Sequence, residues 1–374
     1  MRATNVDGMN AVALGIPQVG GAPSRLANAG SFGAAAAAAP TRLNSPWLLD
    51  TYGRRARDLR VSLTDKCNLR CTYCMPAEGL SWLPGDELLT DDELMRVIAI
   101  AVRELGIEEI RFTGGEPLLR KGIVDLIGRV SQLSPRPEIS LTTNGIGFAR
   151  RALDFVGAGL DRVNISLDSL HPETFRQLTR RPRLADVIDA LAAASEAGLA
   201  PVKINTVLLR GVNDHEAADL LQFSVERGYQ LRFIEQMPLD AGHSWTRSGM
   251  VTADEIQAAL AQRFTLTPHG SARLGAPAEL FTVDGGPATV GIIASVTRPF
   301  CGDCDRTRLT ADGQVRTCLF SAQETDLRAL LRGGGSDEQI ADAWRIATWG
   351  KLPGHGINDP SFLQPDRPMS AIGG

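Results

Sequence analysis

The stretch Cys67-Asn68-Leu69-Arg70-Cys71-Thr72-Tyr73-Cys74 decides how the rest of this sequence is interpreted. Its three cysteines are separated by three and then two residues, and no fourth cysteine lies nearby in the sequence. Structural zinc sites and most iron–sulfur clusters use four ligands, so a group of three indicates a metal site with an open coordination position. The alternative is a structural zinc site that a distant ligand completes.

The six cysteines of the chain form two such groups of three. The second group is Cys301, Cys304 and Cys318, spaced by two and then thirteen residues. We find no secretory signal pattern, and cysteines in a reducing compartment are more often metal ligands than disulfides. We therefore expect two metal sites in a cytoplasmic protein.

Length and composition narrow the class of protein. The chain has 374 residues, which suits a barrel with an added domain. Hydrophobic residues make up 43% and charged residues 22%, as in ordinary globular proteins, and no long apolar run predicts a membrane span. The net charge of −4 argues against a general polyanion binder, so we expect no nucleic-acid partner. An anionic ligand would have to meet a local cluster of Arg and Lys.

The first 50 residues differ from the rest. They are rich in Ala, Gly, Asn and Pro, have no helical or strand periodicity, and contain Asp7 as the only acid before Asp50. We interpret them as a disordered leader, with an acid-poor targeting peptide as the alternative.

From residue 58 onward, short apolar strands alternate with helical patterns. The first strand delivers the cysteine loop at its C-terminal end, and Thr90-Asp91-Asp92-Glu93 is a capping box that opens a helix. The alternation predicts βαβ units and a parallel sheet curled into a barrel, with reactive residues at the C-terminal strand ends. The predicted strands are 58–63, 109–113, 139–142, 162–167, 202–208 and 231–235.

Unusual residues gather at these predicted strand ends. Each motif alone is more often a turn or part of the core, but their shared location at one rim favours a functional site. The motifs are Gly114-Gly115-Glu116-Pro117, Thr142-Thr143-Asn144-Gly145, Ser166-Leu167-Asp168-Ser169, Lys203-Ile204-Asn205-Thr206 and Glu235-Gln236-Met237-Pro238.

The C-terminal third carries weaker signals. A capping box at Thr252-Ala253-Asp254-Glu255 predicts a helix, and strands at 281–283 and 289–293 flank a turn at 284–287. We expect these strands to form a small lid domain that bears the second cysteine group, and a loop at 332–336 between two helices.

Several of these motifs together resemble a known family. Cys-x3-Cys-x2-Cys with Tyr73 before its last cysteine, followed by Gly-Gly-Glu-Pro after the next strand, resembles the radical S-adenosylmethionine (SAM) superfamily. The second cysteine group, Arg306-Thr307-Arg308 directly after its first pair, and the terminal Gly373-Gly374 resemble the GTP 3′,8-cyclases of molybdenum cofactor biosynthesis. The resemblance covers about residue 58 to the end.

The resemblance implies a fold and two cofactors. The α/β fold would be a partial (βα)6 TIM-type barrel at 51–240, after the leader at 1–50, with a C-terminal α+β domain at 241–374. Cys67, Cys71 and Cys74 would hold a [4Fe–4S] cluster whose fourth iron binds SAM. The second group would hold another [4Fe–4S] cluster, with an open iron for the guanine of GTP.

The resemblance also implies roles for single residues. Glu116 would accept a hydrogen bond from the methionine ammonium of SAM, with a helix-start carboxylate as the alternative. The SAM-binding residues would be Tyr73, Gly115, Ser166 and Met237. The GTP-binding residues would be Arg60, Arg111, Thr142, Lys203, Arg306, Thr307 and Arg308, and the catalytic residues Arg60, Gly373 and Gly374.

The reaction that the resemblance implies is a rearrangement of GTP. A deoxyadenosyl radical made from SAM removes hydrogen from ribose carbon 3′, and the sugar radical attacks carbon 8 of guanine. The resulting nitrogen-centred radical is then reduced. The product is (8S)-3′,8-cyclo-7,8-dihydroguanosine 5′-triphosphate. The implied partners are an unidentified electron donor, the next enzyme of the pathway and a second copy in a homodimer, with no membrane partner.

Other interpretations stay open from the sequence. One is another radical SAM enzyme with two clusters, such as a peptide-modifying maturase. A second is a non-catalytic metal-binding protein in which His243, His269 or His355 completes a zinc site. A third is an inactive scaffold, although every motif residue that the reaction needs is present.

Overall fold

The computed structural model describes residues 45–270 and 275–373. The chain divides into Met1–Pro40, which lies outside the described residues, and one compact unit, Thr41–Gly374. Most of the predicted leader therefore falls outside the description, and so does Gly374.

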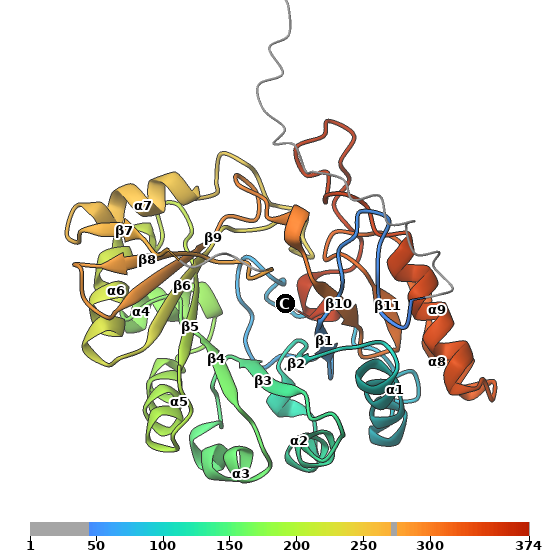
Figure 1. The fold of residues 1–374 in the computed structure, drawn as a ribbon. Helices are drawn as coiled ribbons and strands as arrows, with labels where there is room; N and C mark the ends of the chain where they lie inside the picture. Colours follow the sequence, from blue (N-terminus) through green and yellow to red (C-terminus); the bar gives the residue numbers. More distant parts are fainter. Residues whose placement is uncertain (1–44, 271–274, 374) are drawn as a thin grey trace, which may run out of the picture. The chain divides into compact units, whose positions relative to one another are not determined.

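The compact unit is built on one curved sheet with helices on its outer side (Figure 1). Its strands follow the order β12-β11-β10-β1-β2-β3-β4-β5-β6-β9-β8-β7. The described strands are β1 (Asp58–Ser62), β2 (Glu109–Thr113), β3 (Glu138–Thr143), β4 (Arg162–Ser166), β5 (Lys203–Val207), β6 (Gln230–Ile234), β7 (Leu266–Pro268), β8 (Glu279–Val283), β9 (Thr289–Ile293), β10 (Arg306–Leu309), β11 (Gln314–Arg316) and β12 (Thr325–Asp326).

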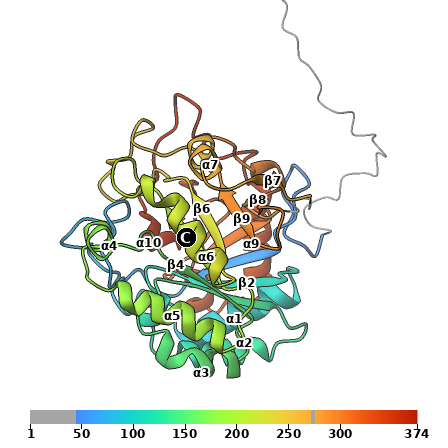
Figure 2. The same ribbon diagram turned by 90° about the vertical axis from the view of Figure 1, so that its left-hand side faces the viewer.

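The helices fill the connections between the strands. Helix α5 lies against β4 and α6 against β6, as Figure 2 shows from the side. The described helices are α1 (Asp91–Arg103), α2 (Ile123–Ser131), α3 (Ala152–Gly157), α4 (Pro172–Thr179), α5 (Leu184–Glu196), α6 (Ala217–Glu226), α7 (Ala253–Ala261), α8 (Leu327–Arg332), α9 (Asp337–Trp349) and α10 (Met369–Ile372), with short 3₁₀ turns η2 (Pro117–Leu119), η3 (Ala149–Arg151), η4 (Asp214–Glu216) and η5 (Cys301–Asp303).

The predicted barrel is confirmed. Strands β1 to β6 pair in parallel in chain order, at the six predicted positions. Both predicted capping boxes are present, at the starts of α1 and α7. The predicted loop at 332–336 separates α8 from α9.

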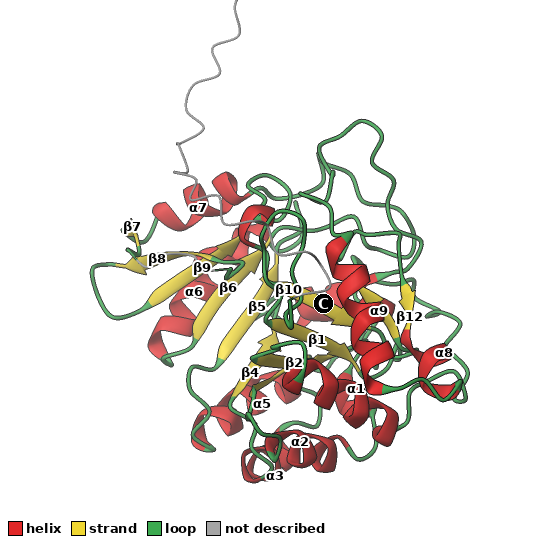
Figure 3. Ribbon diagram, turned by 45° about the vertical axis from the view of Figure 1, so that its right-hand side comes forward, coloured by secondary structure: helices red, strands yellow, loops and turns green. Residues whose placement is uncertain are grey.

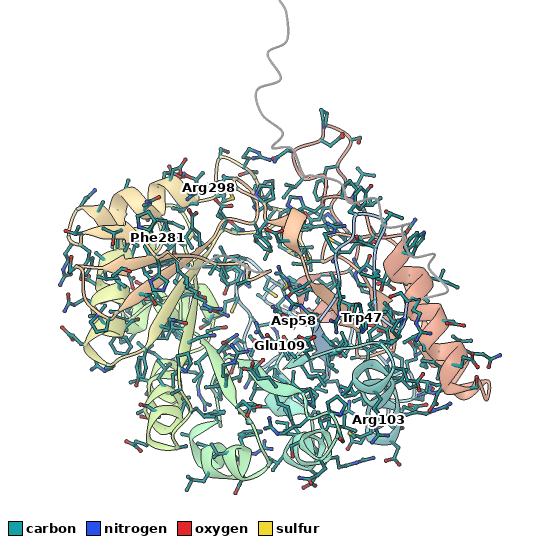
Figure 4. The ribbon with its side chains drawn as sticks, viewed as in Figure 1. Trp47, Asp58, Arg103, Glu109, Phe281 and Arg298 are labelled. Atoms are coloured by element: carbon teal, nitrogen blue, oxygen red, sulfur yellow. The ribbon has the colours of Figure 1, made fainter. Side chains whose placement is uncertain are left out.

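The two faces of the sheet differ in chemistry. On β1, Leu59 and Val61 are fully buried in the hydrophobic core with the helices, whereas Arg60 points to the other face. Alternation along a strand sends successive side chains to opposite faces, so the same division repeats on the neighbouring strands. Figure 4 shows Asp58 and Glu109, register partners at the starts of β1 and β2, close together in the middle of the sheet. The inner face of the barrel is therefore polar and charged.

The C-terminal third extends this sheet at both edges instead of forming a separate lid. Strand β9 pairs in parallel with β6, and the antiparallel strands β8 and β7 follow it. At the other edge, β10 pairs in parallel with β1, followed by β11 and β12. Unpaired strand edges readily accept further strands, which accounts for this arrangement. The division into domains at residue 240 stays a prediction.

Figure 3 separates the strands from the helices around them. Among the described residues, none of these helices has the length and apolar character needed to cross a membrane.

Candidate active site

A cavity lies against the inner face of the barrel. Strands β1 to β6 supply one wall, and the second cysteine group with its flanking loops supplies another. The lining residues are Arg60, Arg111, Thr142, Asn164, Asn205, Arg232, Ile234, Met237, Pro277, Ile293, Ser295, Phe300, Cys301, Cys304, Arg306, Arg308, Thr317, Cys318, Leu319, Phe320, His355 and Met369.

The barrel wall is rich in arginine because strand register brings the side chains together. Arg60 is the register partner of both Arg111 on β2 and Arg308 on β10. Arg306 lies two residues before Arg308 on the same face, and Arg232 is paired in register with Asn205 on β5. Five guanidinium groups from four strands therefore face one cavity.

Carboxylates neutralise only part of this charge. Asp58 pairs with Arg60 at 3.1 Å, and although burial raises the pKa of Asp58, Arg60, Arg111 and Arg306 together lower it to about 2. Among the described residues, Arg111, Arg232 and Arg308 form no ion pair with a carboxylate. The Nε atoms of Arg232 and Arg306 are buried, and neither has a hydrogen-bond partner among residues 45–270 and 275–373. Such groups favour a bound anion, because buried cations are costly when unpaired.

The pKa values of the basic groups reflect this crowding. Burial, followed by the neighbouring cation Arg60, lowers the pKa of Arg111 to about 9 and that of Arg308 to about 9. Burial and nearby arginines lower the pKa of Arg232 to about 10. The cations of the cavity wall therefore repel one another, and a bound anion would offset this repulsion.

Lys203 does not lie where the strand-end prediction put it. It is the first residue of β5, at the opposite end from the C-terminal rim, and it is not among the cavity-lining residues. Burial and the cations Arg232, Arg162 and Arg111 lower its pKa to about 7. Lys203 therefore belongs to the same group of neighbouring cations, but it lies at the N-terminal end of β5, outside the cavity lining.

Thr142 and Thr307 have different positions. Thr142 lines the cavity. The side chain of Thr307 points to the other face of β10, where its hydroxyl accepts a 2.9 Å hydrogen bond from Trp344 Nε1 on α9. Alternation along the strand explains this, since Arg306 and Arg308 on either side face the cavity.

The thiols of the second cysteine group open onto the cavity. Cys301 and Cys304 lie at the ends of the η5 turn, and Cys318 follows β11. Backbone N–H groups of His355 and Arg306 donate to the sulfurs of Cys301 and Cys304. Burial raises the pKa of Cys304, but Arg306 and Lys351 outweigh that effect and lower it.

The first cysteine group is buried beside the strand ends. The Leu69 N–H lies 3.4 Å from the sulfur of Cys67, Asn144 Nδ2 lies 3.9 Å from the same sulfur, and the Ser370 N–H donates to Cys74. Burial raises the pKa of Cys67 to about 11 and that of Cys74 to about 12, and it also raises the pKa of Cys71 well above its usual range. Three grouped thiols, two of them with N–H donors at their sulfurs, fit the ligands of an iron–sulfur cluster, which deprotonates its cysteines.

In the described part of the chain, no three His, Cys, Asp or Glu side chains are grouped as ligands of one metal ion. His355 lies near the second group, but its Nε2 is 2.9 Å from the Ser295 carbonyl and its Nδ1 accepts from the Ile357 N–H. Both ring nitrogens are engaged, which argues against the zinc alternative at this position.

The paired glycines after β2 hold the first cysteine loop in place. A Cβ atom on Gly115 would lie 2.4 Å from the Lys66 carbonyl oxygen, and one on Gly114 would lie 2.4 Å from that of Thr64. The Gly115 N–H donates to the Thr64 carbonyl at 2.7 Å. Only glycine allows these two backbone segments to approach so closely.

Glu116 has the role that we named as the alternative. It is fully buried, and its carboxylate accepts hydrogen bonds from the Leu118 N–H at 3.0 Å, the Thr143 hydroxyl at 2.7 Å and the Asn144 N–H at 2.7 Å. Burial raises its pKa to about 7. Glu116 thus caps the η2 turn and ties it to the end of β3.

The other residues predicted to bind SAM lie around the same rim. The Tyr73 hydroxyl donates to Asp168 at 2.7 Å, and Ser166 ends β4. Met237 lines the cavity, whereas Tyr73, Gly115 and Ser166 are not among its lining residues. The structure therefore brings Met237 together with the basic wall. Tyr73 and Gly115 lie in or against the first cysteine loop, and Ser166 lies at the end of β4.

The C-terminal tail runs between the two cysteine groups. Arg308 donates to the Gly373 carbonyl, and Met369 lines the cavity. Gly373 has φ +85°, and a Cβ atom on it would lie 2.8 Å from Thr113 Cγ2, so the position is open only to glycine. Gly374 lies outside the described residues.

Sequence reasoning missed part of the cavity wall. Arg232 and Asn164 were inside predicted strands but were not singled out, whereas Asn205 was named only as part of a strand-end motif. The alternation of β6 puts Arg232 on the inner face, which was the available signal. Phe300, Phe320 and Met369 are loop or tail residues with no such pattern.

Comparisons with known proteins identify the family of the chain. Residues 61–224 match the family described as "Radical SAM superfamily", and residues 229–357 match "Molybdenum Cofactor Synthesis C". Among solved structures, Streptococcus suis SuiB has a TM-score of 0.54 at 14% identity, covering 82% of this chain and 68% of that one, a likeness that shows the fold alone.

The chain matches two relatives at high identity over nearly the whole length of each relative. A protein named GTP 3′,8-cyclase from Streptomyces coelicolor is 66% identical over 328 residues, 87% of this chain and 96% of that protein. One of the same name from Mycolicibacterium smegmatis is 58% identical over 372 residues, 98% of this chain and 100% of that protein. Identity at this level over whole chains, together with both matching family regions, shows that the chain belongs to the GTP 3′,8-cyclase family of radical SAM proteins.

Proposed function

We propose that the protein is a radical SAM lyase that converts GTP to (8S)-3′,8-cyclo-7,8-dihydroguanosine 5′-triphosphate, in the first step of molybdenum cofactor biosynthesis. The observation that carries the proposal is the single cavity lined both by five arginines and by the second cysteine group. A nucleoside triphosphate has a strongly anionic end and a heteroaromatic end, and the cavity offers a partner for each. Family membership supplies the reaction.

The arginine wall would bind the triphosphate. Guanidinium groups present forked donors that match phosphate oxygens, and they bind most strongly where water is excluded. Arg111, Arg232 and Arg308 have no carboxylate partner among the described residues, so phosphate oxygens would supply the missing negative charge. Arg60 and Arg306 would add to the same contact, and Lys203 would contribute its charge from below.

The part of the cavity next to the second cysteine group would hold the base. Phe300, Phe320 and Met369 give this part an apolar lining next to the three cysteines. A substrate fixed at both ends has its ribose held between them, and holding reacting atoms in one geometry is a large part of catalysis. Thr142 and Asn164 line the wall beside the arginines, where a ribose could bond with them.

Two groups of cysteines would hold the cofactors. Cys67, Cys71 and Cys74 would bind one [4Fe–4S] cluster, and Cys301, Cys304 and Cys318 a second. When bound, SAM and the first cluster supply the radical chemistry of the superfamily. Met237, Tyr73, Gly115 and Ser166 would bind SAM. For Gly115 the close packing against the cysteine loop supports an indirect part, through the loop's position.

The tail would complete the site. Gly373 contacts Arg308 and lies against the inner face of β1 and β2, which supports a role in placing that arginine toward the substrate. We extend this role to Gly374. An electron donor, a homodimeric partner, the next enzyme of the pathway as product acceptor and a cytoplasmic location are further proposals that rest on the family.

Anaerobic reconstitution tests the proposal. We expect about eight irons and a matching amount of sulfide per chain. Incubation with reductant, SAM and GTP should then give deoxyadenosine and an isomer of GTP, identified by mass and by its fragments. SAM cleavage with unchanged GTP would be consistent with the radical SAM superfamily but would refute GTP as the substrate. Zinc in place of iron would refute the radical mechanism.

A further inference from the structure

Lys351 makes an unusual set of contacts behind the second cysteine group. Its Nζ donates to the Cys304 carbonyl at 3.1 Å, to the Cys304 sulfur at 3.4 Å and to the Arg306 carbonyl at 3.0 Å. An ammonium group has three donors, and these three acceptors use all of them. Lys351 is 5% exposed and is not among the cavity-lining residues.

This buried ammonium lacks an acidic partner. Within residues 45–270 and 275–373, Lys351 forms no ion pair with any carboxylate. Burying an unpaired charge is expensive, and proteins retain such groups where another charge arrives from a ligand or metal. The sulfur of Cys304 is the acceptor next to Lys351 that becomes negative when it binds metal. The structure thus provides a positive charge for an anion at this cysteine.

Helix α9 fixes the position of the lysine. The helix ends at Trp349, and the Lys351 N–H bonds back to the Thr348 carbonyl at 3.0 Å. Trp344 of the same helix is fully buried and donates to Thr307 on β10. The packing of α9 on β10 therefore holds Lys351 beside the strand that follows Cys301 and Cys304 in the sequence.

Arg54 approaches the same turn but is already neutralised. Its Nη1 donates to the Cys301 carbonyl at 2.6 Å, while its Nε pairs with Asp50. The pair as a whole is neutral, and Arg54 also binds the carbonyls of Leu352 and Pro353. Of Arg54 and Lys351, only Lys351 therefore adds net positive charge beside the second cysteine group.

We propose that Lys351 is the positioning residue and counter-charge of the second cluster. This inference rests on the proposed function, because it needs a cluster bound by Cys301, Cys304 and Cys318. Lys351 holds the carbonyls of both Cys304 and Arg306. It therefore also fixes the position of Arg306, a member of the arginine wall, relative to that cluster.

The charge has a predictable effect on reduction. A fixed positive charge near a cluster stabilises the reduced form, which carries one more electron, and so raises the reduction potential. Lys351→Gln keeps a polar donor but removes the charge. We expect the reduction equilibrium to become about tenfold less favourable, which is about 59 mV more negative for a one-electron couple.

The test isolates the second cluster. In a full-length background with Cys67, Cys71 and Cys74 changed to serine, iron per chain is measured after reconstitution. A dithionite titration followed by electron paramagnetic resonance then gives the midpoint potential, and the rate of iron loss to a chelator gives retention. We expect Lys351→Gln to lower the potential and to lose iron about tenfold faster. Lys351→Arg, which restores the charge, should stay near the parent.

The control removes the same charge elsewhere. Lys121→Gln alters an exposed lysine after the η2 turn and should leave both readouts unchanged. If Lys351→Gln behaves like Lys121→Gln, the inference is wrong and the proposed function stands. If the parent background binds no iron, the second cluster itself is wrong, and the inference fails with it. Should Lys351→Gln not fold, Lys351→Met keeps the buried stem and gives the same comparison.

Discussion

Replacing Arg111 by methionine should stabilise the protein and weaken its binding of GTP. Arg111 is 8% exposed, has no carboxylate partner among the described residues and donates from Nε to the Ser140 hydroxyl at 3.0 Å. Its ordinary pKa of 12.5 falls to about 9 through burial and then through Arg60. The folded protein therefore charges this group at a cost that methionine would not have.

The magnitude follows from the two pKa values. A difference of about 3.5 units, from 12.5 to about 9, corresponds to roughly 5 kcal/mol of unfavourable charging in the folded state. Loss of the hydrogen bond to Ser140 and of packing costs on the order of 3 kcal/mol. We expect a net stabilisation of about 2 kcal/mol. In a chain of this size that raises Tm by roughly 4 °C.

Binding should change in the opposite direction. Removing one member of a buried charge pair costs about 2–5 kcal/mol, and a loss of about 3 kcal/mol weakens affinity roughly a hundredfold. Thermal unfolding without nucleotide gives the first quantity, and anaerobic equilibrium dialysis with GTP gives the second. Arg103→Met is the control, because Arg103 is exposed on α1, at the outside of the molecule in Figure 4.

A result in which Arg111→Met loses stability and keeps the affinity of the unaltered protein for GTP would refute this reasoning. It would mean that Arg111 is a structural residue and that the arginine wall is not the triphosphate site. A gain in stability with unchanged affinity would refute the binding role alone.

Three further outcomes test the other parts of the site. Cys71→Ser should abolish SAM cleavage, whereas Cys304→Ser should retain SAM cleavage and form no cyclised nucleotide; product formed by Cys304→Ser at the unaltered rate would contradict the assignment. Gly115→Ala should roughly halve the iron content, because its Cβ would lie 2.4 Å from a backbone oxygen of the first cysteine loop; full iron content would show that the loop can yield. Deleting Gly373 and Gly374 should lower turnover at least tenfold with iron content unchanged, and equal turnover would mean that the tail has no catalytic part.

Much of the barrel could be predicted because its signals are local. Strands β1 to β6 have period-two apolar patterns, and capping boxes mark the starts of helices such as α1. Strand β10 escaped prediction for a physical reason. It has four residues, two of them arginines, and its strand character comes from pairing with β1, some 250 residues away in sequence.

The site residues likewise divide into those with a local sequence signal and those whose position depends on distant packing. The six cysteines are recognisable by residue type and spacing, so both groups were predicted. Arg232 was not, because alternation along β6 gives only its face of the sheet, and its place beside Asn205 depends on the register between β5 and β6. Lys351 is 47 residues from Cys304, and only the packing of α9 on β10 brings the two together. The prediction for Thr307 treated Arg306-Thr307-Arg308 as one motif, whereas strand alternation sends its middle side chain to the opposite face.

The charge distribution of the barrel links stability to function. At the N-terminal end of the strands, Arg162 is paired with Glu109 and Glu138, so carboxylates of the protein itself neutralise that arginine. Toward the cavity, Arg111, Arg232 and Arg308 have no such carboxylates in the described residues. A fold selected for stability alone would pair or remove these cations, since buried unpaired charge is costly. Their retention in one cavity, beside three cysteines, is therefore best explained by a ligand whose negative charge completes the site.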